Sequence, residues 1–242
     1  MKSLNIGFVG GCVNKQEGIK RQDLFYSIIQ KELMTRIDLK VSLASYFSYE
    51  LLPNDVLNFL NKKKPDILCL FIRPFPLMPL NKLFIKYQIE GRPKEIAFHS
   101  QLFDREMKWG IKFSNEERGP YISKKRKYFA LKDLNIVAGF VLGLHHWANN
   151  YVIDRIEKVN DICLTKNVKL VVISPPKYTN SIILNFVSSR TTKYLEDFCK
   201  PKIIFVNINN INEFESDRIH LNRVGHRELG LAILRDIECL LE

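Results

Sequence analysis

Apolar runs of strand length alternate along this sequence with longer segments whose apolar residues recur at helical spacing. The predicted strands cover residues 4–9, 39–44, 66–72, 169–174 and 202–208. The predicted helices cover residues 24–33, 51–60 and 151–165, and a last helix is expected to bury Val224, Leu231, Leu234, Ile237 and Leu241. Strands separated by helices indicate a mostly parallel sheet of five strands with helices on both faces, which is a three-layer α/β/α sandwich.

Length and composition favour one globular α/β domain over residues 1–242, since 46% of the residues are hydrophobic. The longest nearly apolar run, residues 136–144, is far shorter than the roughly 20 residues of a membrane-spanning helix. The first residues lack the pattern of a secretory signal, so a cytoplasmic location is expected.

The five cysteines are odd in number and lack a Cys-x-x-Cys spacing, which indicates neither a disulfide framework nor a zinc site. Four of them are expected to pack as small apolar residues, namely Cys69, Cys163, Cys199 and Cys239. Cys12 differs because it follows two glycines, where a tight turn into a helix lowers the pKa of a thiol and exposes its sulfur.

The formal net charge of +11 raises the question of a nucleic acid or a membrane surface as partner. Basic residues cluster only at 62–64 and 124–127, and no basic motif interleaved with aromatic residues is present. A nucleic acid is therefore not expected as a partner. The charge fits an anionic substrate or acyl carrier, or solubility alone.

Several residues that can carry chemistry follow predicted strands. Ligands of parallel sheets bind outside the carboxyl ends of the strands, so these segments are expected to converge there. The residues are Gly10, Gly11, Cys12, Ser45, Arg73 and Ser174, with Asp217 and His220 on the loop before the last helix. An aspartate three residues before a histidine can orient the imidazole as a base, although a surface aspartate and a solvated histidine give the same pattern.

The order of these segments resembles the SGNH (GDSL-type) hydrolase superfamily over most of the chain. The last block matches well, with Asp217, His220, Leu221, Asn222 and Gly225 in the places of the family's Asp-x-x-His and the residues after it. Gly10-Gly11-Cys12 stands where the family has Gly-Asp-Ser, and Arg73-Pro74-Phe75 where it has Gly-x-Asn. The resemblance also implies that residues 77–150, rich in aromatic residues, are an insertion that forms a lid or a substrate-binding wall.

The resemblance implies an acyl-ester hydrolase or acyltransferase that forms a covalent intermediate on Cys12. His220 would transfer the proton and Asp217 would orient His220, while Gly11, Ser45 and Arg73 would hold the oxyanion or the substrate. The implied substrate is an O-acylated carbohydrate or small metabolite, and no cofactor or metal is implied. Because the family's aspartate and asparagine are missing at Gly11 and Phe75, a ligand-binding protein that keeps the fold without the chemistry is the alternative. A dinucleotide-binding oxidoreductase is disfavoured, because the Gly-x-Gly-x-x-Gly spacing is absent.

Overall fold

Five parallel strands form one sheet in the computed structural model of this chain. The structure describes residues 3–10, 19–37, 40–47, 53–72, 137, 141, 143–175, 182–200, 202–211 and 221–241. The strands are β1 (Ser3–Gly10), β2 (Lys40–Phe47), β3 (Ile67–Phe71), β4 (Lys169–Ile173) and β5 (Ile204–Val206). Their order is β2-β1-β3-β4-β5, and each neighbouring pair is parallel. The predicted α/β fold class is confirmed.

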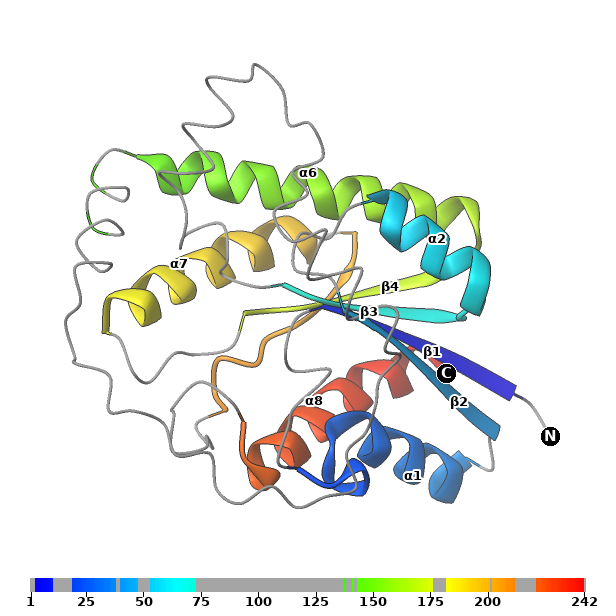
Figure 1. Ribbon diagram of the computed structural model, residues 1–242. Helices are drawn as coiled ribbons and strands as arrows, with labels where there is room; N and C mark the ends of the chain where they lie inside the picture. Colours follow the sequence, from blue (N-terminus) through cyan, green and yellow to red (C-terminus); the bar gives the residue numbers. More distant parts are fainter. Residues whose placement is uncertain are drawn as a thin grey trace.

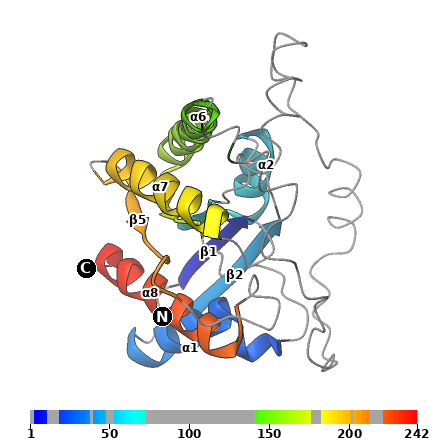
Figure 2. The ribbon, with the colours of Figure 1, turned by 90° about the vertical axis from the view of Figure 1, so that its left-hand side faces the viewer.

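Helices cover both faces of the sheet, as Figure 2 shows. α1 (Phe25–Ile37) and α8 (Arg223–Leu241) pack against each other on one face. On the other face lie α2 (Pro53–Lys63), α6 (Leu144–Thr165) and α7 (Ile182–Cys199), with α6 in contact with both of its neighbours. No helix among the described residues is long and apolar enough to cross a membrane.

The strands supply two separate hydrophobic cores because their side chains alternate between the faces. All five residues of β3 are buried; Ile67, Cys69 and Phe71 join the core under α1 and α8, whereas Leu68 and Leu70 join the core under α2 and α6. A central parallel strand is covered on both faces, which explains why its sequence is apolar throughout rather than alternating.

The largest differences between the predicted and observed helices concern α6 and α7. The helix predicted to begin at residue 151 begins at Leu144, after Gly143 in a left-handed conformation, and it ends at Thr165 as predicted. Helix α7 was not predicted, and it crosses from β4 to β5 on the face that α6 covers. A right-handed crossover is the usual connection between neighbouring parallel strands, so a helix in this position follows from the topology.

The buried face of the last helix also differs from the prediction. Leu234 and Ile237 are buried, but Val224, Leu231 and Leu241 are exposed. The buried positions run instead through Gly225, His226, Leu229, Gly230, Ile233, Leu234 and Ile237. A Cβ atom at position 230 would lie 2.9 Å from the carbonyl oxygen of Phe25, so glycine allows α8 to approach α1 closely. The buried face of the helix therefore combines large apolar side chains with glycine and histidine.

Candidate active site

The strands point to the left in Figure 1, and Figure 2 looks onto the edge formed by their carboxyl ends. The register aligns the last residues of neighbouring strands: Gly10 of β1 pairs with Phe47 of β2, and Phe71 of β3 pairs with Ile173 of β4. Chain segments that leave these four strands therefore begin at one edge of the sheet. This is where ligands of open parallel sheets bind.

Most of the predicted site residues lie outside the described residues, namely Gly11, Cys12, Arg73, Asp217 and His220. Ser45 is described as part of the backbone of β2, where it pairs with Phe8. The strand was predicted to end at residue 44 but continues to Phe47, so Ser45 lies within β2 rather than after it. The described residues therefore fix where the site segments start and end.

Gly10 ends β1 immediately before the predicted nucleophile turn. A Cβ atom at this position would lie 2.4 Å from the Cβ of Phe71 on the neighbouring strand. Contacts this short are not tolerated in a close-packed interior, so β1 and β3 can converge here only with glycine at position 10. The backbone thus holds Gly10, two residues before Cys12, against the end of β3. Arg73 follows two residues after the end of β3.

Ser174 anchors the start of the segment that carries Asp217 and His220. Its side chain is fully buried, and its hydroxyl accepts a hydrogen bond of 2.9 Å from the backbone N–H of Ile208. Its own N–H donates to the carbonyl of Val206. These bonds hold the chain after β5 at the carboxyl end of β4, and Ile211 is the last described residue before the segment.

Leu221 and Asn222 anchor the end of the same segment, directly after His220. Leu221 is buried in the core beneath α8. The side-chain oxygen of Asn222 accepts a hydrogen bond of 2.9 Å from the N–H of Gly225, three residues on. This is the geometry of an N-cap, which satisfies one of the free amide donors at the start of a helix. The cap fixes the chain direction two residues after His220.

The described residues that follow the Cys12 segment contact those that follow the His220 segment. The 3₁₀ helix η2 (Arg21–Asp23) follows the segment with Cys12, and the Asp23 carboxylate accepts a bond of 3.0 Å from the Nε of Arg223. Just after these two residues, Phe25 stacks on the buried ring of His226 with ring centroids 6.1 Å apart. Sequence reasoning missed Asp23, although an acidic residue just before a helix is a usual signal of the helix start.

Cys69, Cys163 and Cys199 are buried, as predicted. Cys239 was also expected to pack as a small apolar residue, but it is exposed, so the prediction for Cys239 is wrong. Burial raises the pKa of the Cys163 and Cys199 thiols to about 12, and it raises the pKa of Cys69 further.

Since thiolates are the reactive form, iodoacetamide near neutral pH should leave Cys69, Cys163 and Cys199 unmodified in the folded protein. Peptide mapping by mass spectrometry tests this. Alkylation of all three at the rate of Cys239 would contradict the packing described here.

The cap at Asn222 leads to a prediction about stability. Asn222→Ala should lower the free energy of unfolding by about 1 kcal/mol, because the N–H of Gly225 loses its acceptor. Urea denaturation followed by circular dichroism measures the change. Asn222→Asp is the matched control and should keep most of the stability, because a carboxylate oxygen replaces the amide oxygen; equal loss in both variants would refute the capping role.

Among the described residues, no three His, Cys, Asp or Glu side chains gather closely enough to hold a metal ion.

No protein-family model and no curated protein matches the sequence. Solved structures do match along nearly the whole chain. The lipase Lip_vut3 from a goat rumen metagenome is 13% identical, with a TM-score of 0.56 over 96% of this chain and 97% of its own.

TesA gives the same TM-score of 0.56 at 8% identity, over 98% of this chain and 99% of its own. The chain has the fold of these proteins. A single-site mutant of Axe2, an acetyl-xylooligosaccharide esterase from Geobacillus stearothermophilus, is 11% identical with a TM-score of 0.50 over 98% of this chain and 95% of its own. At these identities the likeness is one of fold.

Proposed function

We propose that this chain is an SGNH-type acyl-ester hydrolase or acyltransferase that works through a covalent acyl intermediate on Cys12. The proposal assigns His220 as the proton-transfer residue and Asp217 as the residue that orients it. It assigns the backbone amide at Gly11, with the guanidinium of Arg73, to the oxyanion. Ser45 lies within β2, two residues before the strand ends, so its predicted place at the oxyanion is not kept. The fold shared with a lipase and an esterase supports this class of reaction.

The observation that carries the proposal is the ion pair between Asp23 and Arg223. Cys12 lies in the short segment between Gly10 and η2, and His220 is three residues before Arg223. Both segments also start at the carboxyl edge of the sheet, at β1 and at the Ser174 anchor. Both segments start at the same edge of the sheet, and the Asp23–Arg223 ion pair joins the residues that follow them. This arrangement supports a contact between the Cys12 thiol and the His220 imidazole.

The proposed reaction has two halves. The Cys12 sulfur attacks the carbonyl carbon of the ester while His220 takes the thiol proton, and the tetrahedral oxyanion forms. The intermediate collapses to a thioester and expels the alcohol, which receives that proton from His220. Water or an acceptor hydroxyl then attacks the thioester with His220 as base, which releases the acid or the new ester and restores the thiol.

Cysteine in place of serine retains a nucleophile, and a thiol is intrinsically the stronger one. The missing asparagine is the larger departure, because one oxyanion donor is worth about 10²–10³ in rate. A guanidinium at Arg73 supplies donors and a positive charge near the same place. An O-acylated carbohydrate or small metabolite is the proposed substrate class, in keeping with the acetyl-xylooligosaccharide esterase of the same fold.

Hydrolysis assays on acetylated xylooligosaccharides and on p-nitrophenyl acetate test the proposal. Release of acetate from either substrate that is lost in His220→Ala supports an esterase. Transfer of the acetyl group to an added sugar, at the expense of free acetate, supports an acyltransferase. If no ester is cleaved and no adduct forms, while the intact sugars raise the melting temperature, the ligand-binding alternative is correct.

A further inference from the structure

Five exposed lysines gather at the end of the molecule opposite the proposed active site. We call this surface the lysine corner, and its members are Lys62, Lys63, Lys64, Lys166 and Lys169. They lie where α2 and α6 end and β3 and β4 begin, at the right-hand end of Figure 1. α2 packs against α6, and the N–H of Lys169 donates to the carbonyl of Asp66, two residues after Lys64.

The charge of the lysine corner is not neutralised within the described part of the chain. None of the five ammonium groups forms an ion pair with another described residue. Asp66 is the acidic side chain in the middle of the corner, and its carboxylate accepts the backbone N–H of Asn5 at 2.7 Å. The dipole of α2 favours cations in its last turn, which accounts for Lys62 and Lys63. Lys64, Lys166 and Lys169 lie outside the helices.

An exposed leucine lies among these lysines. Leu164, in the last turn of α6 and two residues before Lys166, has 67% of its surface exposed. Leucine is usually buried, and here it is exposed beside Lys166, with the exposed Asp161 one helical turn before it. Basic side chains around a protruding apolar one are typical of proteins that bind the interface of a bilayer, where the apolar side chain enters the headgroup region.

We propose that the lysine corner docks this protein on an anionic lipid bilayer. The lysines would lie against the lipid headgroups and Leu164 would insert between them. The carboxyl edge of the sheet, with the proposed active site, would then face away from the membrane, because the two edges are at opposite ends of the strands. The protein would hold its site toward water-soluble substrates. Binding of the lysine corner to lipid does not depend on the proposed enzymatic activity, whereas the orientation of the site and the exclusion of an acyl carrier rest on it.

The composition of the corner favours a lipid surface over other polyanions. Single-stranded nucleic acids are bound through aromatic side chains on which bases stack. The only described aromatic residue of α2, Phe59, is buried, and the exposed Phe186 and Tyr194 lie on α7. An acyl carrier would have to deliver its cargo to the carboxyl edge, so the corner is at the wrong end of the molecule for that partner.

Vesicle flotation tests the proposal with the full chain. The protein should float with phosphatidylcholine vesicles that contain roughly one third phosphatidylglycerol, and not with pure phosphatidylcholine. The variant Lys62→Glu, Lys64→Glu, Lys166→Glu should partition at least about 100-fold more weakly. Leu164→Ser should weaken partitioning about tenfold without changing retention on heparin.

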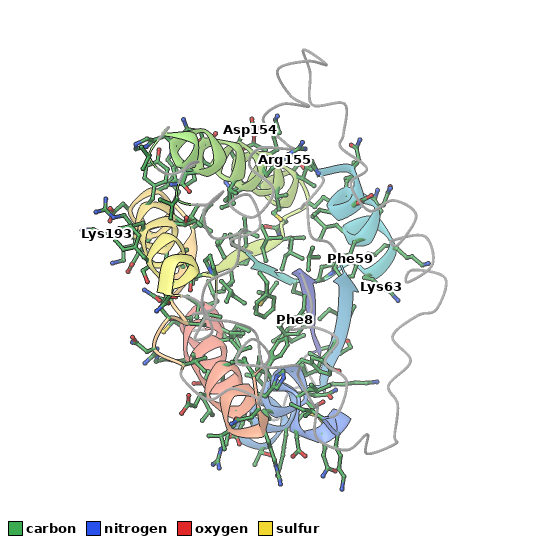
Figure 3. The ribbon with its side chains drawn as sticks, turned by 60° about the vertical axis from the view of Figure 1, so that its left-hand side comes forward. Phe8, Phe59, Lys63, Asp154, Arg155 and Lys193 are labelled. Atoms are coloured by element: carbon green, nitrogen blue, oxygen red, sulfur yellow. The ribbon has the colours of Figure 1, made fainter. Side chains whose placement is uncertain are left out.

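The matched control reverses three exposed cations elsewhere, Lys31→Glu, Lys193→Glu and Arg227→Glu, so that the net charge is the same. Figure 3 shows Lys63 of the corner and Lys193 of the control on opposite sides of the view. Partitioning of this control onto the anionic vesicles should fall by less than about fivefold. Equal loss in both triple variants, or failure of the wild type to bind anionic vesicles at low salt, would overturn the proposal. The proposal would also be overturned if the protein bound duplex DNA more tightly than anionic vesicles and Leu164→Ser did not change the affinity for DNA.

Discussion

Replacing Cys12 by alanine should reduce the hydrolysis of p-nitrophenyl acetate by about 10⁴-fold or more, because Cys12 is the residue assigned to form the covalent intermediate. Initial rates from released p-nitrophenol measure the effect. Cys239→Ser is the matched control, since it removes the one described cysteine that is exposed, on the far part of α8. It should leave the rate unchanged.

Cys12→Ser sharpens this prediction, because a serine nucleophile keeps the reaction possible while needing a stronger base. This variant should retain measurable activity above that of Cys12→Ala. If Cys12→Ala hydrolyses the ester at the wild-type rate, the nucleophile assigned here is wrong. The fold and the lysine corner would be unaffected by that result.

Asp217→Asn should lower kcat by about 10³–10⁴-fold with little change in KM, because the amide no longer holds the correct tautomer of His220. His220→Ala should lower kcat by at least as much. Steady-state kinetics on p-nitrophenyl acetate separate the two constants. Since the two residues act as a unit, the double variant should be about as active as His220→Ala alone.

Additive losses in that double variant would contradict a shared role for Asp217 and His220. If Asp217 and His220 had only a structural role, their variants would have a lower melting temperature but would keep their activity per folded molecule. Glu228, exposed on the first half of α8, offers a control for carboxylate removal near the same helix. Glu228→Gln should change neither constant.

The sheet could be predicted because its central strands are almost entirely apolar and the strands are separated by helical patterns. Burial on both faces explains the apolar runs of β3 and of β4 after Lys169. Strand boundaries were less predictable, as β2 shows, because its last residues at the edge of the sheet carry polar and aromatic side chains that also suit a loop.

The buried face of α8 could not be read from apolar residues alone. Tertiary packing selects Gly230 for its small size and His226 for its flat ring against Phe25, and neither signals burial in a hydrophobicity pattern. Helix α7 was missed for a related reason. Its buried positions include Ser188, Thr191 and Thr192, so its inner face is partly polar.

The site residues were predicted from a resemblance in order and spacing, which locates segments but not side chains. The structure adds contacts that no spacing rule contains: the Asp23–Arg223 ion pair and the hydrogen bond from Ile208 to Ser174. Both join residues far apart in the sequence. Such contacts depend on how the strands are ordered in space, and the strand order itself follows only once the fold is known.

The most direct test of the central claim is the mass of the intact protein after brief exposure to p-nitrophenyl acetate. The Cys239→Ser protein should gain the mass of one acetyl group, peptide mapping should place it on Cys12, and the adduct should be absent from the Cys239→Ser, His220→Ala protein. Acetylation at other residues only, or of Cys12 to the same extent without His220, would contradict an active site formed by these two ends of the chain.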